Sequence, residues 1–167
     1  MKRFSTVAGG LASLMLLGGG CSSNGGTDPA ASGVAPVGFA DIAVSAGGHT
    51  SCMYLAESVA QRSLGLMEAT SLGGRDGMVF RFGETTQSAF YMYKTKMALS
   101  IAFIDTVGTV NEVLDMEPCT SAEPRECFLY RPKAPYVSAI EVKVGEATTL
   151  GLTPGSKVAL EGPCTVS

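Results

Sequence analysis

Residues that commonly hold metals are scarce in this sequence. His49 is the only histidine among 167 residues, and no two cysteines stand in a C-x-x-C spacing. The chain also lacks a Gly-x-Ser-x-Gly nucleophile motif and a glycine-rich phosphate-binding loop. A lone histidine in a loop is typically a surface residue. We therefore predict neither a metal site nor a cofactor.

Basic residues are few and are not clustered. Lys and Arg number 12 against 15 Asp and Glu, which gives a formal net charge of −3. Loss of Lys2 and Arg3 with a signal peptide would leave 12 − 2 basic residues against 15 acids, a charge of about −5. Because contacts to phosphates need clustered Lys and Arg, this balance argues against nucleic acid and against electrostatic attraction to anionic lipid.

The N-terminus carries an apolar stretch that is too short to cross a bilayer. It runs from Phe4 to Leu17 after a basic start, whereas a spanning helix needs roughly 20 apolar residues. The segment ends in Leu16-Leu-Gly-Gly-Gly-Cys21, which resembles a bacterial lipoprotein signal with Gly18 in the usual place of a leucine. We expect residues 1–20 to be a signal peptide and Cys21 to be lipidated. The alternative is an ordinary cleaved signal followed by an unmodified Cys21.

The next segment, residues 21–38, is small, polar and rich in Gly, Pro and Ala. Such a composition buries too little apolar surface to offset the entropy of ordering, so we interpret it as a flexible tether. A single β-rich domain would then occupy residues 39–167. Together these features predict an extracytoplasmic domain in the bacterial cell envelope, anchored to the membrane by its N-terminal lipid.

Hydrophobic patterning within the domain favours β-strands. Leu99 to Asp105 and Thr109 to Met116 flank a turn that contains Gly108, which is typical of a hairpin. One short helix is expected from Ser58 to Leu66, because Ser58 and Gln61 fit a capping box. With about eight short strands, the pattern predicts a mostly β fold, either an antiparallel β-sandwich or a distorted barrel.

Alternation along two strands also assigns side chains to faces. Glu112 falls on the same face as Val110, Leu114 and Met116, which is unusual for a charge. In the strand from Tyr136 to Val144, Tyr136 is expected to share a face with Ile140 and Val142, and Glu141 to lie on the other face.

The five cysteines indicate disulfides. If Cys21 is lipidated, four remain, and an even number in an exported domain suggests two bridges. Cys119 and Cys127 flank an irregular loop, so we pair them, which leaves Cys52 with Cys164. The alternative, a thiolate metal site or redox pair, is disfavoured by the missing C-x-x-C spacing.

Several short motifs together resemble the domain of unknown function 192 family. They are Gly65-Leu-Met67, Asp76-Gly-Met-Val-Phe80, the run from Phe90 to Thr95, and Ala139-Ile-Glu-Val142 followed by Gly145. The resemblance covers about residues 40 to 162. Within the family, the sequence is most similar to a secreted, lipoprotein-like subgroup. It implies a small, single-domain, mostly β protein with a jelly-roll-like arrangement.

Three positions depart from the pattern of that family. Ala69 stands where the family usually has Arg, Lys94 where it has Asn, and Ser100 where it has Asp. The resemblance thus implies that an active site built on those polar residues would be altered in this chain.

Three acids are candidates for general acid–base chemistry. Glu141 leads, because it matches a glutamate of the family, and Glu112 and Asp105 could pair with it. The alternative for each is a solvated or structurally paired carboxylate. Contact with a ligand could instead involve Tyr91, Tyr93, Lys94 and Arg62, although Arg62 is expected to point outward and the aromatic rings could equally belong to the core.

Three functions remain open. The first is a non-catalytic, membrane-tethered envelope domain that binds a small molecule, a glycan or another envelope protein. The second is a hydrolase-like enzyme that uses the acidic residues. The third is a metal-handling lipoprotein that uses methionine thioethers, although the methionines are dispersed along the chain rather than clustered.

Overall fold

The structure, a computed structural model, describes residues 33–164. The predicted signal peptide, Cys21 and residues 22–32 of the predicted tether lie outside this range. The rest of the tether segment contacts the domain. The Thr70 N–H donates to the carbonyl of Val34 at 2.9 Å, and the Val34 N–H donates to the Thr70 Oγ1 at 2.8 Å. Gln61 Nε2 donates to the carbonyl of Gly38. Val34 and Gly38, at the end of this segment, are therefore hydrogen-bonded to the domain.

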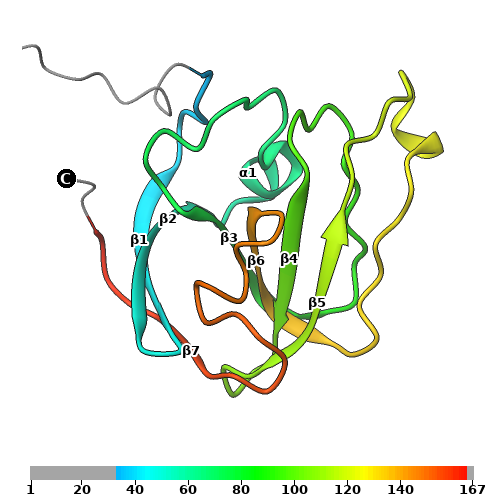
Figure 1. The fold of residues 1–167 in the computed structure, drawn as a ribbon. Coiled ribbons are helices and arrows are strands. Elements are labelled where there is room, and N and C mark those ends of the chain that lie inside the picture. The colour runs from blue at the N-terminus through cyan, green and yellow to red at the C-terminus, as the bar shows by residue number, and fades with distance from the viewer. Residues whose placement is uncertain (1–32, 165–167) are drawn as a thin grey trace, which may run out of the picture.

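The described chain is mostly β with one short α-helix, as predicted (Figure 1). In chain order its elements are β1 (Ala40–Ala46), β2 (His49–Ala56), α1 (Val59–Leu64), β3 (Gly77–Thr86), β4 (Leu99–Ile104), β5 (Val110–Met116), the 3₁₀ helix η2 (Pro124–Glu126), β6 (Tyr136–Lys143) and β7 (Val158–Leu160).

All seven described strands belong to one sheet, in the order β5-β4-β6-β3-β2-β1-β7. Five of the six neighbouring pairs are antiparallel, and β2 and β3 are parallel. The parallel pair corrects the expectation of a purely antiparallel sheet. It arises because α1 carries the chain from the end of β2 back to the start of β3, which is the crossover that parallel strands require.

The sheet curls until its two ends meet. Val110 at the start of β5 donates to the carbonyl of Ser156 at 3.0 Å, and Val158 in β7 donates to the carbonyl of Gly108 at 2.8 Å. An isolated bridge between Thr109 and Lys157 joins the same two segments. The fold is therefore a distorted, partly closed barrel, one of the two arrangements expected from the sequence.

Each face of the sheet carries a hydrophobic core. The inner core includes Val79 of the central strand β3 together with Val44 of β1 and Val110 of β5, two strands near opposite ends of the sheet order. Leu152, from the segment between β6 and β7, also belongs to it; Figure 1 shows this segment inside the curve of the sheet. The outer core lies on the other face of the central strands, and Leu66 and Met92 from loops cover it.

Irregular pairing changes two of the expected faces. Phe103 of β4 pairs with Glu112 but Ile104 pairs with Val110, so Asn111 is an extra residue in β5. This bulge puts Val110 in the inner core while Met116 is in the outer core. A register shift between β3 and β6 has the same effect on Tyr136, which packs in the outer core although Ile140 and Val142 lie in the inner one.

Candidate functional site

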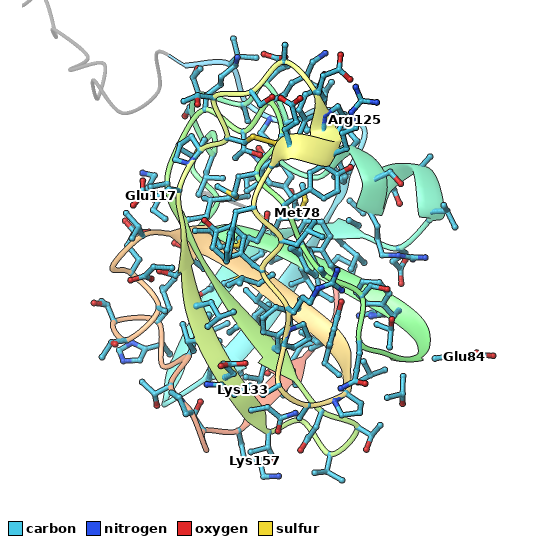
Figure 2. All side chains as sticks on the ribbon, turned by 90° about the vertical axis from the view of Figure 1, so that its right-hand side faces the viewer. Met78, Glu84, Glu117, Arg125, Lys133 and Lys157 are labelled. Carbon is cyan, nitrogen blue, oxygen red and sulfur yellow. A yellow bond between two sulfur atoms is a disulfide. The ribbon has the colours of Figure 1, made fainter. Side chains whose placement is uncertain are left out.

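Glu141 is the one charged residue that is buried within residues 33–164, with 5% of its surface exposed. Its neighbours Ile140 and Val142 lie in the inner core, so strand alternation directs Glu141 to the outer face. There it pairs with Met78 of β3 and Ile101 of β4, both fully buried. Figure 2 shows Met78 in the interior of the molecule. Burial in these apolar surroundings raises the pKa of Glu141 to about 8.

The carboxyl group of Glu141 has no hydrogen-bond or ion-pair partner among the described residues. Every fully buried side-chain oxygen or nitrogen in this part of the chain does have a partner. The Glu141 oxygens are therefore not fully enclosed, and they reach a small cavity that Glu141 lines. An unpaired polar group in such a place costs free energy that a hydrogen-bonding ligand could recover.

The cavity, which we call the Glu141 pocket, has a volume of about 60 Å³. A water molecule needs roughly 10–15 Å³ by the same kind of measure, so the pocket can hold a few waters or one small chemical group. Polar and apolar groups contribute about equally to its walls. Besides Glu141, the walls comprise Arg62, Ser63, Leu64, Gly65, Leu66, Met67, Phe80, Phe90, Tyr91 and Thr95.

One wall of the pocket is built by α1 and the turn after it. The predicted capping box is present: Ser58 Oγ accepts from the Gln61 N–H, and Gln61 Oε1 accepts from the Ser58 N–H. Gly65 ends the helix with φ of +49°, and a Cβ there would come within 3.2 Å of the Phe80 ring. Glycine at this position thus allows both the helix end and its close packing on β3.

The opposite wall comes from the segment before β4. An isolated bridge joins Met67 to Thr95, and Glu68 donates its N–H to the carbonyl of Lys94 at 2.8 Å. Phe90 packs edge-to-face on Phe80 with ring centroids 5.1 Å apart. These contacts hold two segments that are distant in sequence on either side of Glu141.

The sequence predicted that Arg62 would point outward from the helix, and this prediction is wrong. Its Nη1 donates to the carbonyls of Glu57 and Arg81, and its guanidinium carbon lies 4.8 Å from the centre of the Phe82 ring. The side chain is thus folded over β3, where it lines the Glu141 pocket without forming an ion pair with Glu141. The structure brings Arg62, Tyr91 and Glu141 together.

A second hollow of about 200 Å³ adjoins the Glu141 pocket. Four residues line both: Arg62, Ser63, Phe80 and Phe90. The second hollow extends past them to Phe82, Ser88 and Tyr136. The two cavities form an aromatic groove on the outer face of the sheet, with the Glu141 carboxyl at one end.

The other two candidate acids lie elsewhere. Glu112 pairs with Lys133 at 2.7 Å, and hydrogen bonds to Lys133 hold the pKa of this carboxyl below its ordinary value. Lys133 lies over β5, below Met78 in the view of Figure 2. Asp105 accepts hydrogen bonds from the backbone of Val107 and Thr109, which fixes the β4–β5 turn. Neither carboxylate lines the Glu141 pocket, so no pair of acids is assembled there.

Tyr93 and Lys94 also stand apart from the pocket. The Tyr93 hydroxyl donates to the carbonyl of Ala122, in the loop closed by Cys119 and Cys127. Lys94 lies beside it, with Nζ 5.4 Å from the Tyr93 ring centre. The four proposed contact residues therefore split into two groups, and Tyr91 with Arg62 forms the group at Glu141.

Thr95 and Met67 are among the pocket residues that the sequence did not single out as a site. Thr95 is a buried polar residue, and Met67 belongs to the Gly65-Leu-Met67 motif. The signal that could have found Thr95 is its place at the end of the Phe90–Thr95 run, opposite the Gly65-Leu-Met67 motif. What the sequence does not show is that a bridge joins these two motifs.

The disulfides join the cysteine pairs expected from the sequence. Cys52 is bonded to Cys164, and Cys119 is bonded to Cys127. Within residues 33–164 no group of three or more His, Cys, Asp or Glu side chains could hold a metal ion. In the same range no helix has the length and apolar character needed to cross a membrane.

Fold and site together define a small β domain with a buried acid in a pocket on the outer face of its sheet. The sequence model of the DUF192 family, described as "Uncharacterized ACR", matches residues 42–160. The chain therefore belongs to the DUF192 family. No curated protein matches the chain.

Two solved structures resemble the domain. A protein from Sinorhizobium meliloti 1021, whose description proposes a transcription regulator, superposes with a TM-score of 0.64 and 26% identity, covering 75% of this chain and 97% of that one. A protein of unknown function from Novosphingobium aromaticivorans DSM 12444 gives a TM-score of 0.58 and 27% identity, covering 81% of this chain and 99% of that one.

Proposed function

We propose that this protein is a membrane-tethered lipoprotein of the bacterial cell envelope whose β domain binds a small molecule in the Glu141 pocket. The observation that carries the proposal is Glu141, a residue that is 5% exposed, has no partner for its carboxyl group among the described residues and lines a cavity. Binding pockets are typically apolar with a few polar groups that orient the ligand, and the aromatic groove around Glu141 has this character.

The envelope location is supported by three features of the chain. The N-terminal segment ends at Cys21 in a lipoprotein-like signal, a polar tether follows, and two disulfides are formed in the domain. Disulfides persist in oxidising compartments outside the cytoplasm. A DNA-binding regulator, as the description of the Sinorhizobium neighbour would suggest, is disfavoured for this chain because acids outnumber basic residues by 15 to 12.

A small molecule fits the site better than a glycan or a protein does. The pocket and the adjoining hollow measure about 60 and 200 Å³, which suits a compact ligand. A protein partner would need a contact surface of several hundred Å² on this chain. A buried carboxyl group in a small pocket does not provide such a surface.

A thermal-shift screen with small envelope metabolites, glycans and metal salts tests the proposal. A ligand at 100 times its Kd stabilises the folded state by about 2.7 kcal/mol, which raises Tm by several degrees. The shift should disappear in Glu141→Gln and persist in Glu112→Gln, which alters a carboxylate outside the pocket. Stabilisers that act equally on wild type and Glu141→Gln would place binding elsewhere on the chain.

The lipid anchor is tested separately. The intact mass of the protein isolated from the envelope should show an acylated N-terminal Cys21, and globomycin should block maturation of the precursor. A mature protein whose Cys21 carries no acyl chain would contradict the anchor, while the pocket proposal would stand.

A hydrolase-like enzyme is the second candidate. A carboxyl with a pKa near 8 is protonated at neutral pH, which is the form that a general acid needs. Binding is preferred because the residues lining the pocket include no second carboxylate, histidine or cysteine. Turnover of a bound ligand that is lost in Glu141→Gln, while binding is kept, would favour the enzyme.

A further inference from the structure

We propose that the ligand of the Glu141 pocket carries a primary ammonium group that sits against the Glu141 carboxylate, with an apolar body in the adjoining aromatic hollow. The inference rests on the proposed function, because it takes this pocket as the binding site. It adds the chemical class of the ligand.

The ionised form of Glu141 would need a cation that this chain does not provide. Glu141 has no positively charged partner, and burial cannot favour its ionised form by itself. Arg62 is the one basic side chain in the lining, but its Nη1 donates to two backbone carbonyls and its guanidinium rests on the Phe82 ring. The carboxylate is therefore left for the counter-ion that a ligand brings.

The walls suit an ammonium group. Phe80, Phe90 and Tyr91 line the pocket, and cations are attracted to the faces of aromatic rings. Thr95 Oγ1 lies 3.5 Å from the carbonyl of Tyr93 as its donor, which leaves the hydroxyl lone pairs as acceptors. An ammonium has three N–H donors and no acceptor, so Glu141 and Thr95 both complement it.

The size of the two cavities divides the ligand into a head and a body. About 60 Å³ at Glu141 admits an ammonium with one or two methylene groups. The adjoining hollow of about 200 Å³, lined by Phe82 and Tyr136, admits an alkyl or aryl body. A short alkylammonium is therefore the minimal probe of the site.

Binding of an ammonium requires Glu141 to lose its proton. In this step the ligand RNH₃⁺ binds to the neutral carboxyl group of Glu141. The products are the ion pair between RNH₃⁺ and the carboxylate, and one H⁺ that is released to solvent. Besides Glu141, the ionisable side chains of the lining are Arg62 from α1 and Tyr91 from the segment before β4. Glu141 is the one carboxyl group of the lining, so we assign the released proton to it.

Isothermal titration of the full-length protein in detergent with n-butylammonium chloride tests the inference, with 1-butanol as the neutral probe. Between pH 6 and 7 the affinity for butylammonium should rise about tenfold, and it should level off above about pH 8. Buffers of different ionisation enthalpy should report about one proton released per bound cation at pH 6. Butanol should bind more weakly and without a pH dependence.

Three variants sharpen the test. Glu141→Gln should weaken butylammonium binding at least about tenfold and abolish its pH dependence, whereas Glu112→Gln should change neither. Tyr91→Leu alters a ring that is 38% exposed, so the fold should survive, and it should weaken butylammonium a few-fold more than butanol. Circular dichroism of each variant confirms folding before titration.

The outcomes separate the inference from the proposed function. Equal binding of butanol and butylammonium, or butylammonium binding that Glu141→Gln leaves intact, overturns the ammonium class. If butylammonium does not bind but neutral compounds still stabilise the protein through Glu141, the inference fails and the pocket proposal stands. If no compound acts through Glu141, both fail.

Discussion

Glu141 makes folding depend on pH in a direction opposite to that of most carboxylates. Its pKa is about 8 in the folded chain, against an ordinary value of 4.5. Between these values the folded state holds a proton that the unfolded state has lost, so stability falls as pH rises. The slope contributed by one such group is about 1.4 kcal/mol per pH unit across that window.

We predict that Glu141→Gln removes this dependence. Urea denaturation at pH 5 and pH 8 should show the variant gaining a few kcal/mol over wild type at pH 8 and much less at pH 5. Glu112→Gln is the control, because the pKa of Glu112 is lowered by Lys133 and its contribution is lost only when pH falls below about 4.5. Parallel stability curves for wild type and Glu141→Gln would show that Glu141 is not a buried acid.

Lys94 explains one departure from the family pattern through its backbone. Its φ is +56°, in the left-handed region that Asn tolerates better than Lys does. The Asn that the family has at this position is thus the residue that the turn favours, and Lys94 carries a conformational cost. No chemical role of the Asn is needed to account for the pattern there.

We therefore expect Lys94→Asn to stabilise the domain by about 0.5 kcal/mol, after the loss of the weak contact between Lys94 Nζ and the Tyr93 ring. Guanidinium denaturation measures the change. Lys96→Asn, two residues later at a position without positive φ, should not be stabilising. A destabilised Lys94→Asn would mean that the lysine side chain contributes more than the strained backbone costs.

Ser100 explains a second departure. It stands where the family has Asp, and its Oγ donates to Asp115 Oδ1 at 2.6 Å across the β4–β5 pair. The Ser100 Oγ also accepts a hydrogen bond from the backbone N–H of Gly145 at 3.3 Å. A carboxylate is therefore still present next to position 100, supplied by the neighbouring strand. Loss of the acid at one position is consistent with a retained polar contact rather than with a lost site.

At the scale of elements, α1 links helix stability to the pocket. Ser58 caps the helix, and the last turn of the helix brings Arg62 and Leu64 to the wall beside Glu141. A helix of six residues has little stability of its own and depends on its cap and its packing. Loss of the capping hydrogen bond should therefore also loosen the wall of the Glu141 pocket.

We predict that Ser58→Ala lowers the free energy of unfolding by about 1 kcal/mol. Hydrogen exchange should also show faster opening of the α1 amides, and any pocket ligand should bind more weakly. For the free energy of unfolding and for hydrogen exchange, Ser63→Ala is the matched control, since it is the same substitution in the same helix without a capping bond, and it should be near neutral; because Ser63 lines the pocket, it is not a control for ligand binding. Equal effects of the two substitutions would mean that the capping box adds no stability.

Local sequence signals predicted the elements well because their causes are local. The hairpin around Gly108 and the capping box at Ser58 both depend on a few adjacent residues. The prediction that Tyr136 shares a face with Ile140 and Val142 was wrong, because a shift in β6 pairing breaks the two-residue alternation. The prediction for the face of Glu112 was only partly right, because a bulge at Asn111 breaks the alternation in β5. A bulge depends on the partner strand, which the pattern of one strand does not contain.

The candidate site was predictable in part for the same reason. Glu141 stands between apolar residues in a strand, which marks it as a charge among core positions. That Arg62 and Tyr91 lie at this acid while Glu112 and Asp105 do not follows from how α1 and the loop before β4 pack on the sheet. Packing of that kind is tertiary and leaves no periodic signal in the sequence.

At the scale of the whole molecule, closure of the sheet depends on the C-terminal segment. β7 pairs with β1 and its flanking residues bond to the start of β5, so residues 155–160 join the two ends of the strand order. The Cys52–Cys164 bridge then ties β2 to the chain just after β7. Gly77 lets β3 and β6 approach in the middle, since a Cβ there would meet the carbonyl oxygen of Glu141 at 2.1 Å.

The two disulfides should differ in their contribution to stability. Cys52–Cys164 spans 112 residues, whereas Cys119–Cys127 spans 8. In the chain-entropy model these loops correspond to about 4.8 and about 2.6 kcal/mol, as upper values. The double variant Cys52→Ala with Cys164→Ala should thus lose about 2 kcal/mol more than the variant lacking Cys119–Cys127, measured by urea denaturation under non-reducing conditions.

Because the long bridge holds β7 in place, hydrogen exchange should also show faster opening of the β1 and β7 amides in the first variant, and of residues 119–130 in the second. Equal losses in both variants would mean that the closing segment is held by its backbone pairing with β1 and β5 rather than by the covalent tie.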